Sequence, residues 1–186
     1  MKKTFIEKIA IPEGISCEYS NGILKCTKDS KTLERKLLIP TIEIKIQENE
    51  IIFECKKGNK NDYKKMMASI AHIKNLFLGL NKVFVYKLEF CSVHFPMTLK
   101  IEGNTIKINN FLGEKLPREA KIPEGVDVKI EGNKIIVSSH DRELAGQAAA
   151  NLERATKLRG RDRRIFQDGI YIIEKPSRAL GGAQNA

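Results

Sequence analysis

The segment LERKLLIPTIEIKIQENEIIF, residues 33–53, recurs later in the chain as LPREAKIPEGVDVKIEGNKIIV, residues 116–137. The offset is 116 − 33 = 83 residues at the start of the match and 137 − 53 = 84 at its end. Residues 22–26 likewise match residues 104–108, at an offset of 104 − 22 = 82. Generic strands match once by chance, but not repeatedly in a shared order at a nearly constant offset. The sequence therefore predicts two copies of one module.

The first copy has the pattern of two strand pairs. Residues 15–19 and 23–26 alternate between apolar and polar around Asn21-Gly22, which is a strong hairpin signal. After a polar stretch at residues 28–35, a second alternating pair spans residues 42–46 and 51–55. Amphipathic strands of this kind predict an antiparallel sheet with one buried face.

A helix follows the strands in each copy. In the first, apolar residues recur at steps of three and four from Tyr63 to Phe77, with Asn61 or Asp62 as the expected N-cap and an end near Gly79. The second helix is expected from about Asp141, capped by that residue or by Ser139. The predicted fold class is α+β: two tandem modules, each an antiparallel sheet with a helix on one face, at residues 1–81 and 82–177, before an extended or disordered tail at 178–186.

The second copy carries two additions. One is a strand-like extension at residues 83–94, and the other is the stretch ERATKLRGRDRRIFQDGIYIIEK, residues 153–175. Between Arg154 and Arg164, six basic residues stand against the single acid Asp162, after an alanine-rich helix pattern and before an apolar strand pattern at residues 169–173. The six are Arg154, Lys157, Arg159, Arg161, Arg163 and Arg164.

This basic stretch favours a polyanion as its partner, and RNA in particular. A salt-bridged surface is the alternative, but acids at pairing distance in sequence are missing. Arginine binds phosphate bidentately and stacks on bases, so we expect a shaped RNA site dominated by phosphate and sugar contacts. Phe166 either stacks on a base or fills the core between sheet and helix, and its neighbour Ile165 favours the core.

The overall charge agrees with a nucleic-acid partner. The 186 residues include 33 Lys and Arg against 23 Asp and Glu, a net charge of +10 with a pI of about 9.4. No apolar run approaches the length of a membrane span, and Glu7 and Lys8 interrupt any signal-like core, so no membrane association and an intracellular site are expected. The four cysteines lack zinc-site spacing and are interpreted as reduced strand residues.

Nothing in the sequence indicates catalysis, a metal or a cofactor. The three histidines lie far apart, and no Walker A, G-x-G-x-x-G or nucleophile-elbow motif occurs. His94 is interpreted as structural, and Asp168 as a turn residue before Gly169. Two other classes stay open on these grounds: an RNA-modifying enzyme, which needs a cleft with converging His, Asp or Glu, and a protein-bridging module, which needs large exposed apolar patches.

Four stretches carry a resemblance to a known family. They are HFPMTLKI (94–101), NNFLGEKLPREAKIP (109–123), ELAGQAAANLERAT (143–156) and RDRRIFQDGIYIIEK (161–175). Together they closely resemble the large-subunit ribosomal protein L-six family in its archaeal and eukaryotic form. The resemblance spans the whole chain, is most specific over residues 74–175, and agrees with the internal duplication, because that family is similar in holding two copies of one α+β module.

The resemblance implies a non-enzymatic structural protein of the cytoplasmic ribosome, without a small-molecule substrate. It implies docking on large-subunit rRNA near the sarcin-ricin loop, with large-subunit proteins of the stalk base as neighbours and translational GTPases nearby. Residues 159–164 match the family's basic motif, Asp168-Gly169 its following turn, and residues 110–115 a loop of similar kind. The full predicted RNA-binding set is Arg154, Lys157, Arg159, Arg161, Arg163, Arg164, Asp168, Gly169, Lys175, Arg178, Asn110, Gly113, Lys115 and Arg118.

Overall fold

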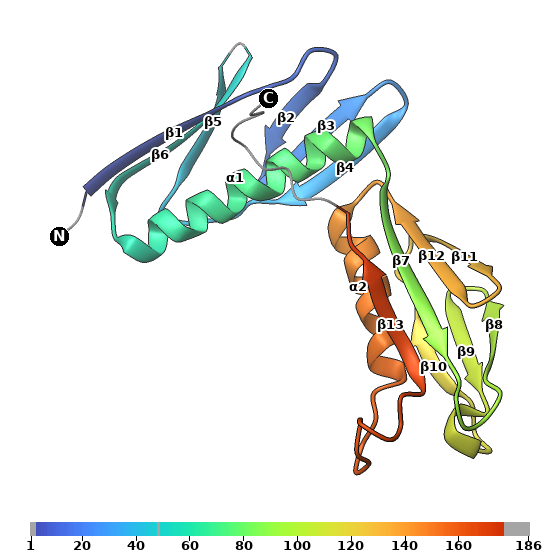
Figure 1. Ribbon diagram of the computed structural model, residues 1–186. Helices are drawn as coiled ribbons and strands as arrows, with labels where there is room; N and C mark the ends of the chain where they lie inside the picture. The colour runs from blue at the N-terminus through green and yellow to red at the C-terminus, as the bar shows by residue number, and fades with distance from the viewer. Residues whose placement is uncertain (1–2, 48, 177–186) are drawn as a thin grey trace, which may run out of the picture. The chain divides into compact units, whose positions relative to one another are not determined.

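The structure is a computed structural model that describes residues 3–47 and 49–176 (Figure 1). The chain divides into two compact units, the first ending at Lys82 and the second beginning at Val83. Both are mixed units of antiparallel sheet and helix, which confirms the predicted α+β class. The expected tail at 178–186, including Arg178, lies outside the described residues.

The first unit contains two three-stranded antiparallel sheets and one long helix. One sheet has the strand order β1-β6-β5 and the other β2-β3-β4. The helix α1 packs against β6, β3 and β4. The bounds are β1 Lys3–Ala10, β2 Ser16–Ser20, β3 Ile23–Lys28, β4 Lys31–Lys36, β5 Glu43–Gln47, β6 Glu50–Gly58 and α1 Lys60–Asn81.

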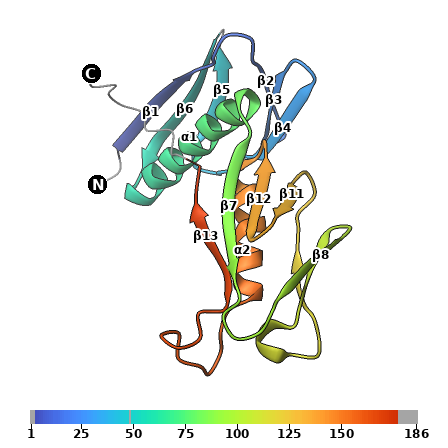
Figure 2. The same cartoon turned by 45° about the vertical axis from the view of Figure 1, so that its right-hand side comes forward.

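The second unit repeats this order and adds a strand. Its sheets are β11-β12-β7-β13 and β10-β9-β8, and α2 packs on strands of both (Figure 2). A short 3-10 turn, η1, joins β9 to β10. The bounds are β7 Phe84–Cys91, β8 Thr98–Glu102, β9 Thr105–Asn109, η1 Phe111–Gly113, β10 Arg118–Lys121, β11 Asp127–Glu131, β12 Lys134–Ser139, α2 Arg142–Ala155 and β13 Gly169–Glu174.

The two sheet topologies correspond strand for strand, which corrects two expectations. Residues 83–94 were expected as an addition to the second copy, but they form β7, whose counterpart is β1. The polar stretch 28–35 was expected outside the strands, but most of it forms β4, which pairs with β3. Alternation in β4 rests on Leu33 and Arg35 alone, so its apolar signal is weak. Among the strands of the described residues, only β13 lacks a counterpart in the first unit.

The cap of α1 is one turn earlier than expected. The side chain of Asn59, and not that of Asn61 or Asp62, accepts from the backbone N–H groups of Asn61 (2.8 Å) and Asp62 (2.9 Å). The Asp62 carboxylate returns a bond to the Asn59 backbone N–H at 3.0 Å, which completes a capping box. The helix also runs past Gly79 to Asn81. For α2 the expected cap is correct, because Asp141 accepts from the Glu143 backbone N–H.

Each unit encloses its own apolar core. In the first, β3, β6 and α1 supply most of the buried side chains, among them Leu24, Phe53 and Ile73. In the second, the core lies between α2 and both sheets, and includes Phe111 and Leu152. All four cysteines lie in strands and are free thiols, as expected. This core in the second unit holds the end of α2 and the start of β13 in place.

The capping box allows a direct test of where α1 begins. Asn59→Ala removes the acceptor for two backbone N–H groups, so the free energy of unfolding should fall by about 1 kcal/mol. The matched control is Asn61→Ala, which truncates an exposed side chain two positions later and should change it by less than about 0.5 kcal/mol. Urea unfolding followed by circular dichroism gives both values, and equal losses in the two variants would contradict the assignment.

Candidate nucleic-acid interface

The basic stretch begins with Arg154 in the last turn of α2 and continues through the loop between α2 and β13, residues 156–168. The first residue of the loop, Thr156, is buried, and its hydroxyl accepts a hydrogen bond from the Ile170 backbone N–H at 2.8 Å while donating to the Glu153 carbonyl at 3.3 Å. This contact ties the end of the helix to the start of the strand. The two ends of the loop are therefore held together by this hydrogen bond.

A local turn orders the tip of the loop. The carboxylate of Asp162 accepts from the Arg164 backbone N–H at 2.9 Å, and its backbone carbonyl accepts from Ile165 and Phe166 at 3.2 and 2.9 Å. Aspartate commonly stabilises turns in this way. The one acid in the basic stretch is thus engaged with backbone groups and forms no ion pair among the described residues.

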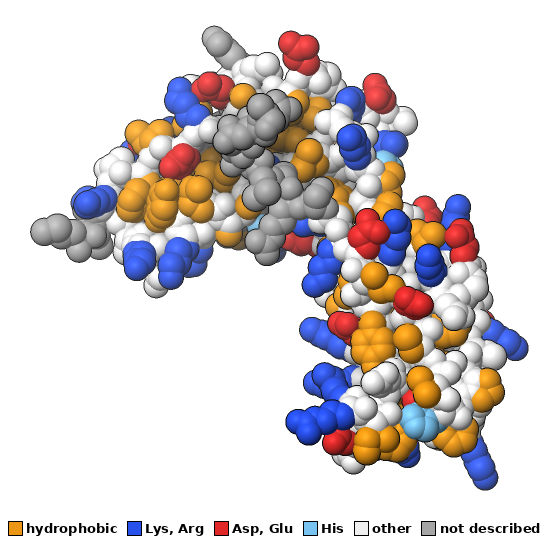
Figure 3. Space-filling model, in the orientation of Figure 1, with side chains coloured by type: hydrophobic (Ala, Val, Ile, Leu, Met, Phe, Trp, Pro, Cys, Tyr) orange, Lys and Arg blue, Asp and Glu red, His pale blue; other side chains and the backbone are white. Residues whose placement is uncertain are grey.

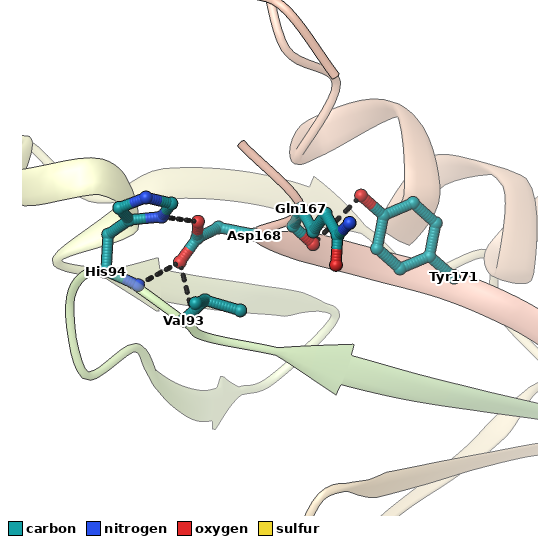
Figure 4. A network of polar contacts seen from close by, with 5 residues as sticks. All are labelled: Val93, His94, Gln167, Asp168 and Tyr171. Carbon is teal, nitrogen blue, oxygen red and sulfur yellow. Dashed lines mark hydrogen bonds and ion pairs between the residues drawn. The ribbon is translucent and has the colours of Figure 1, made fainter. Parts of the chain in front are cut away.

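Asp168 closes the loop from its other end (Figure 4). Its Oδ1 accepts from the backbone N–H groups of Val93 (2.7 Å) and His94 (3.0 Å), and its Oδ2 lies 2.6 Å from Nδ1 of His94. These partners belong to the turn between β7 and β8, so the carboxylate joins the end of the loop to a segment more than seventy residues earlier in the chain. The Tyr171 hydroxyl donates to the backbone carbonyl of the preceding loop residue, Gln167, at 3.1 Å.

The burial of Asp168 assigns it a positioning role. Only 2 % of its surface is exposed and its carboxylate is used to hold the loop, while a contact of this residue with RNA stays a prediction. Burial by itself raises the pKa of this carboxyl, but the hydrogen bonds from His94 and Val93 outweigh it and hold the pKa below its ordinary value. Gly169 is buried as well and lies next to the Tyr171 ring and Thr156, where the two ends of the loop meet.

Phe166 does not fill the core, and that expectation is wrong. It is half-buried at the surface, with its ring centroid 4.9 Å from the His94 ring and 4.8 Å from the Arg161 guanidinium carbon. Its neighbour Ile165 points to solvent and is 64 % exposed. His94, Phe166 and Arg161 therefore form a small stack on the surface, which presents one arginine of the loop in a defined place.

Arg118 attaches a third segment to the same region. Its Nε and Nη2 bind both carboxylate oxygens of Glu114 at 2.7 and 2.6 Å, and its Nη1 donates to the carbonyls of Ala155 (3.0 Å) and Lys157 (3.3 Å). The guanidinium also lies 4.2 Å over the Phe111 ring. The hydrogen bond from Arg118 lowers the pKa of Glu114. This arginine caps the end of α2 with hydrogen bonds inside the unit, and its predicted contact with RNA stays a prediction.

The remaining predicted residues divide by position. Asn110 and Gly113 take left-handed backbone conformations in the turn around η1, and the Asn110 side chain donates to the Pro96 carbonyl at 2.9 Å. Lys115 follows, exposed, on the segment that Arg118 joins to the loop. Lys175 follows β13 at the end far from the loop, separated by six strand residues or roughly 20 Å. The structure thus brings residues 93–97, 110–118 and 154–168 together and leaves Lys175 apart.

Positive charge gathers on the side of the second unit formed by α2 and the loop (Figure 3). Within residues 3–47 and 49–176, none of the six basic side chains forms an ion pair. The guanidinium of Arg161 lies over the Phe166 ring. This contradicts the alternative of a salt-bridged surface. A cavity of about 350 Å³ lies beneath the loop, with Arg154, Lys157 and Arg163 on one part of its lining and Leu158, Ile170 and Tyr171 on another.

Comparison with known proteins identifies the family. The family model for ribosomal protein L6 matches residues 95–169, which include the segments 110–118 and 154–168 and most of 93–97. The large ribosomal subunit protein uL6 of Methanococcus vannielii is 45% identical over 174 residues, covering 94% of this chain and 96% of that protein. The chain belongs to the ribosomal protein L6 family. The resemblance inferred from its motifs is thereby confirmed.

Two further relatives extend the L6 match over nearly the full chain. The uL6 protein of Methanosarcina mazei is 43% identical over 94% of this chain and 99% of its own length, and that of Sulfurisphaera tokodaii is 41% identical over 91% of each. Both halves of the duplication therefore lie within the L6 family. Among the described residues, no helix is long and apolar enough to cross a membrane, and no three His, Cys, Asp or Glu side chains form a group that could hold a metal ion.

Asp168 provides a stability test of how the loop is held. Asp168→Ala leaves three donors in and around the β7–β8 turn without their acceptor, so the free energy of unfolding at pH 7 should fall by about 2–3 kcal/mol. Asp168→Asn keeps an oxygen for the two backbone N–H groups and should lose about half as much. Urea unfolding of both variants checks this, and a loss below about 0.5 kcal/mol for Asp168→Ala would contradict it.

The same carboxyl predicts a pH dependence. Because the pKa of Asp168 is lowered in the folded protein, its contribution is complete above its unfolded value of about 3.9 and is lost as pH falls through the lowered value. The gap in unfolding free energy between wild type and Asp168→Ala should therefore be constant from pH 7 to 5 and shrink below about pH 4. If this difference in unfolding free energy instead grew as the pH fell, the pKa of Asp168 would be raised in the folded protein, and the prediction would be wrong.

Proposed function

We propose that this protein is a structural constituent of the large ribosomal subunit and binds large-subunit rRNA through its second unit. The observation that carries the proposal is the cluster of basic side chains on the loop between α2 and β13, none of which forms an ion pair among the described residues. An ordered loop places these charges before RNA arrives, so less conformational entropy is lost on binding. Relatives across archaea are named large ribosomal subunit protein uL6.

The loop is suited to phosphates that a folded RNA presents at fixed positions. Arginine offers a planar fork of donors that matches phosphate, and four of the five arginines in the stretch, at 154, 159, 163 and 164, have no partner among the described residues. The fifth, Arg161, is oriented by the stack with Phe166. We therefore assign phosphate and sugar contacts to the loop and to Lys157 and Lys115, with shape providing most of the selectivity.

We place the RNA site near the sarcin-ricin loop, beside the stalk base. This finer assignment rests on the resemblance of residues 159–169 to the basic motif and turn of the L6 family. Proteins of the stalk base are then the neighbours, and translational GTPases bind close by. The L6 family is non-enzymatic, so the role is structural, and the setting is the cytoplasmic ribosome. Supporting the factor-binding region is the contribution that we propose for the second unit.

The arginines of the loop tip test the proposed surface. Replacing Arg161, Arg163 and Arg164 by alanine removes up to three phosphate contacts, so affinity for rRNA should fall roughly 100-fold near physiological salt. The slope of log K against log salt should become shallower by about 2–3. Filter binding across a salt series measures both quantities.

The matched control removes the same charge from the first unit. Lys31, Lys57 and Lys74 are exposed and in no ion pair among the described residues, so their replacement by alanine should change rRNA affinity no more than about threefold. Thermal unfolding should be nearly unchanged in both triple variants. Equal losses of affinity would mean that net charge alone, and not the loop, drives binding.

The location of the RNA site has its own experiment. The protein is titrated with an rRNA fragment that contains the sarcin-ricin loop and with a scrambled RNA of equal length. Preference for the first fragment by about tenfold or more, retained as salt rises, supports the proposed site. Equal affinity for both RNAs leaves a general RNA-binding surface and removes the sarcin-ricin assignment.

A further inference from the structure

Two cysteines of the first unit face each other across neighbouring strands. Cys17 in β2 is directly opposite Cys26 in β3 in the antiparallel register, and their sulfur atoms are 3.3 Å apart. Directly opposite residues in such a pair have Cα atoms about 4.5–5.5 Å apart, within the span that a disulfide bridges. Small side-chain movements are therefore sufficient to join the two sulfurs, without a shift of either strand.

The two thiols differ in access and in acidity. Cys17 is half-buried, whereas Cys26 is 0 % exposed and lies in the core of the unit. The hydrogen bond between the two thiols lowers the pKa of Cys17, although the burial of Cys17 acts in the other direction. The same hydrogen bond and burial raise the pKa of Cys26. Since the thiolate is the reactive form, Cys17 is the sulfur that reagents from solvent meet as a nucleophile.

We propose that Cys17 and Cys26 form a thiol–disulfide modification site that reacts with low-molecular-weight disulfides such as oxidised glutathione. The Cys17 thiolate attacks one sulfur of the reagent, whose S–S bond breaks, and the leaving half takes a proton from solvent as a free thiol. Cys26 then loses its proton to solvent and attacks Cys17, which releases the second half of the reagent as a thiol. Two cysteines are oxidised to one disulfide, and one small disulfide is reduced to two thiols.

The other two cysteines are not placed for the same reaction. Cys55 in β6 is opposite Phe5, and Cys91 in β7 is opposite Gly169. Cys55 is also almost completely buried. Neither has a thiol as its partner in the strand register, so a mixed disulfide formed there has no cysteine across the strand to resolve it. The chain thus supplies its own internal control for the pair.

The test treats the native full chain with oxidised glutathione, quenches it with an alkylating agent and maps the peptides by mass spectrometry. A variant with Cys55→Ala and Cys91→Ala keeps only the pair. Both proteins should yield the peptide joined through Cys17 and Cys26 at similar rates, and dithiothreitol should reverse the reaction. Little mixed disulfide should accumulate, because Cys26 is adjacent and resolves it quickly.

Single variants separate the two steps. Cys26→Ala should trap glutathione on Cys17 as a stable mixed disulfide, whereas Cys17→Ser should leave Cys26 reduced over the same time. Circular dichroism confirms that each variant is folded. The proposal is overturned if the joined peptide forms only in denaturant, or if Cys17 stays unmodified in the folded Cys26→Ala protein. RNA binding is not used as a readout, so the result is independent of the proposed ribosomal role.

Discussion

The buried carboxylate of Asp168 is the contact on which the basic surface depends. A loop with five cations and two acids carries a net positive charge that repels itself, and alone it would sample many conformations. Three hydrogen bonds from Val93 and His94 hold its last residue against the β7–β8 turn, and Thr156 holds its first. The charges can therefore stand close together because both ends of the loop are held by buried groups.

The duplication explains where this loop could arise. Both units share the order of six strands and a helix, and in the first unit β1 remains at the edge of its sheet. In the second, β13 pairs with the corresponding edge of β7. That pairing returns the chain to the β7–β8 turn and brings the start of β13 beside His94. One added strand thus converts a shared scaffold into a scaffold with a closed, basic loop at one end.

Basic residues in this region have two different tasks. Arg118 uses four hydrogen bonds to join Glu114 with the carbonyls at the end of α2, so its charge stabilises the scaffold. Arg163 and Arg164 have no such partners among the described residues and remain available to a ligand. The number of internal partners separates these tasks, and it is the reason why the binding surface that we propose consists of the loop, Lys115 and the neighbouring exposed cations.

The amino-acid sequence by itself determined the two modules, most of the strands, both helices and the stretch that carries the positive charge. These features depend on local periodicity and on repetition, which neighbouring residues record. Tertiary structure decided what depends on distant partners. The weakly alternating residues of β4 became a strand because β3 pairs with them, and Asn59 became the cap of α1 because Asp62 completes the box. Asp168 and Arg118 hold the scaffold together because His94 and the end of α2 reach them from far along the chain, and contacts across such separations leave no periodic signal in one sequence.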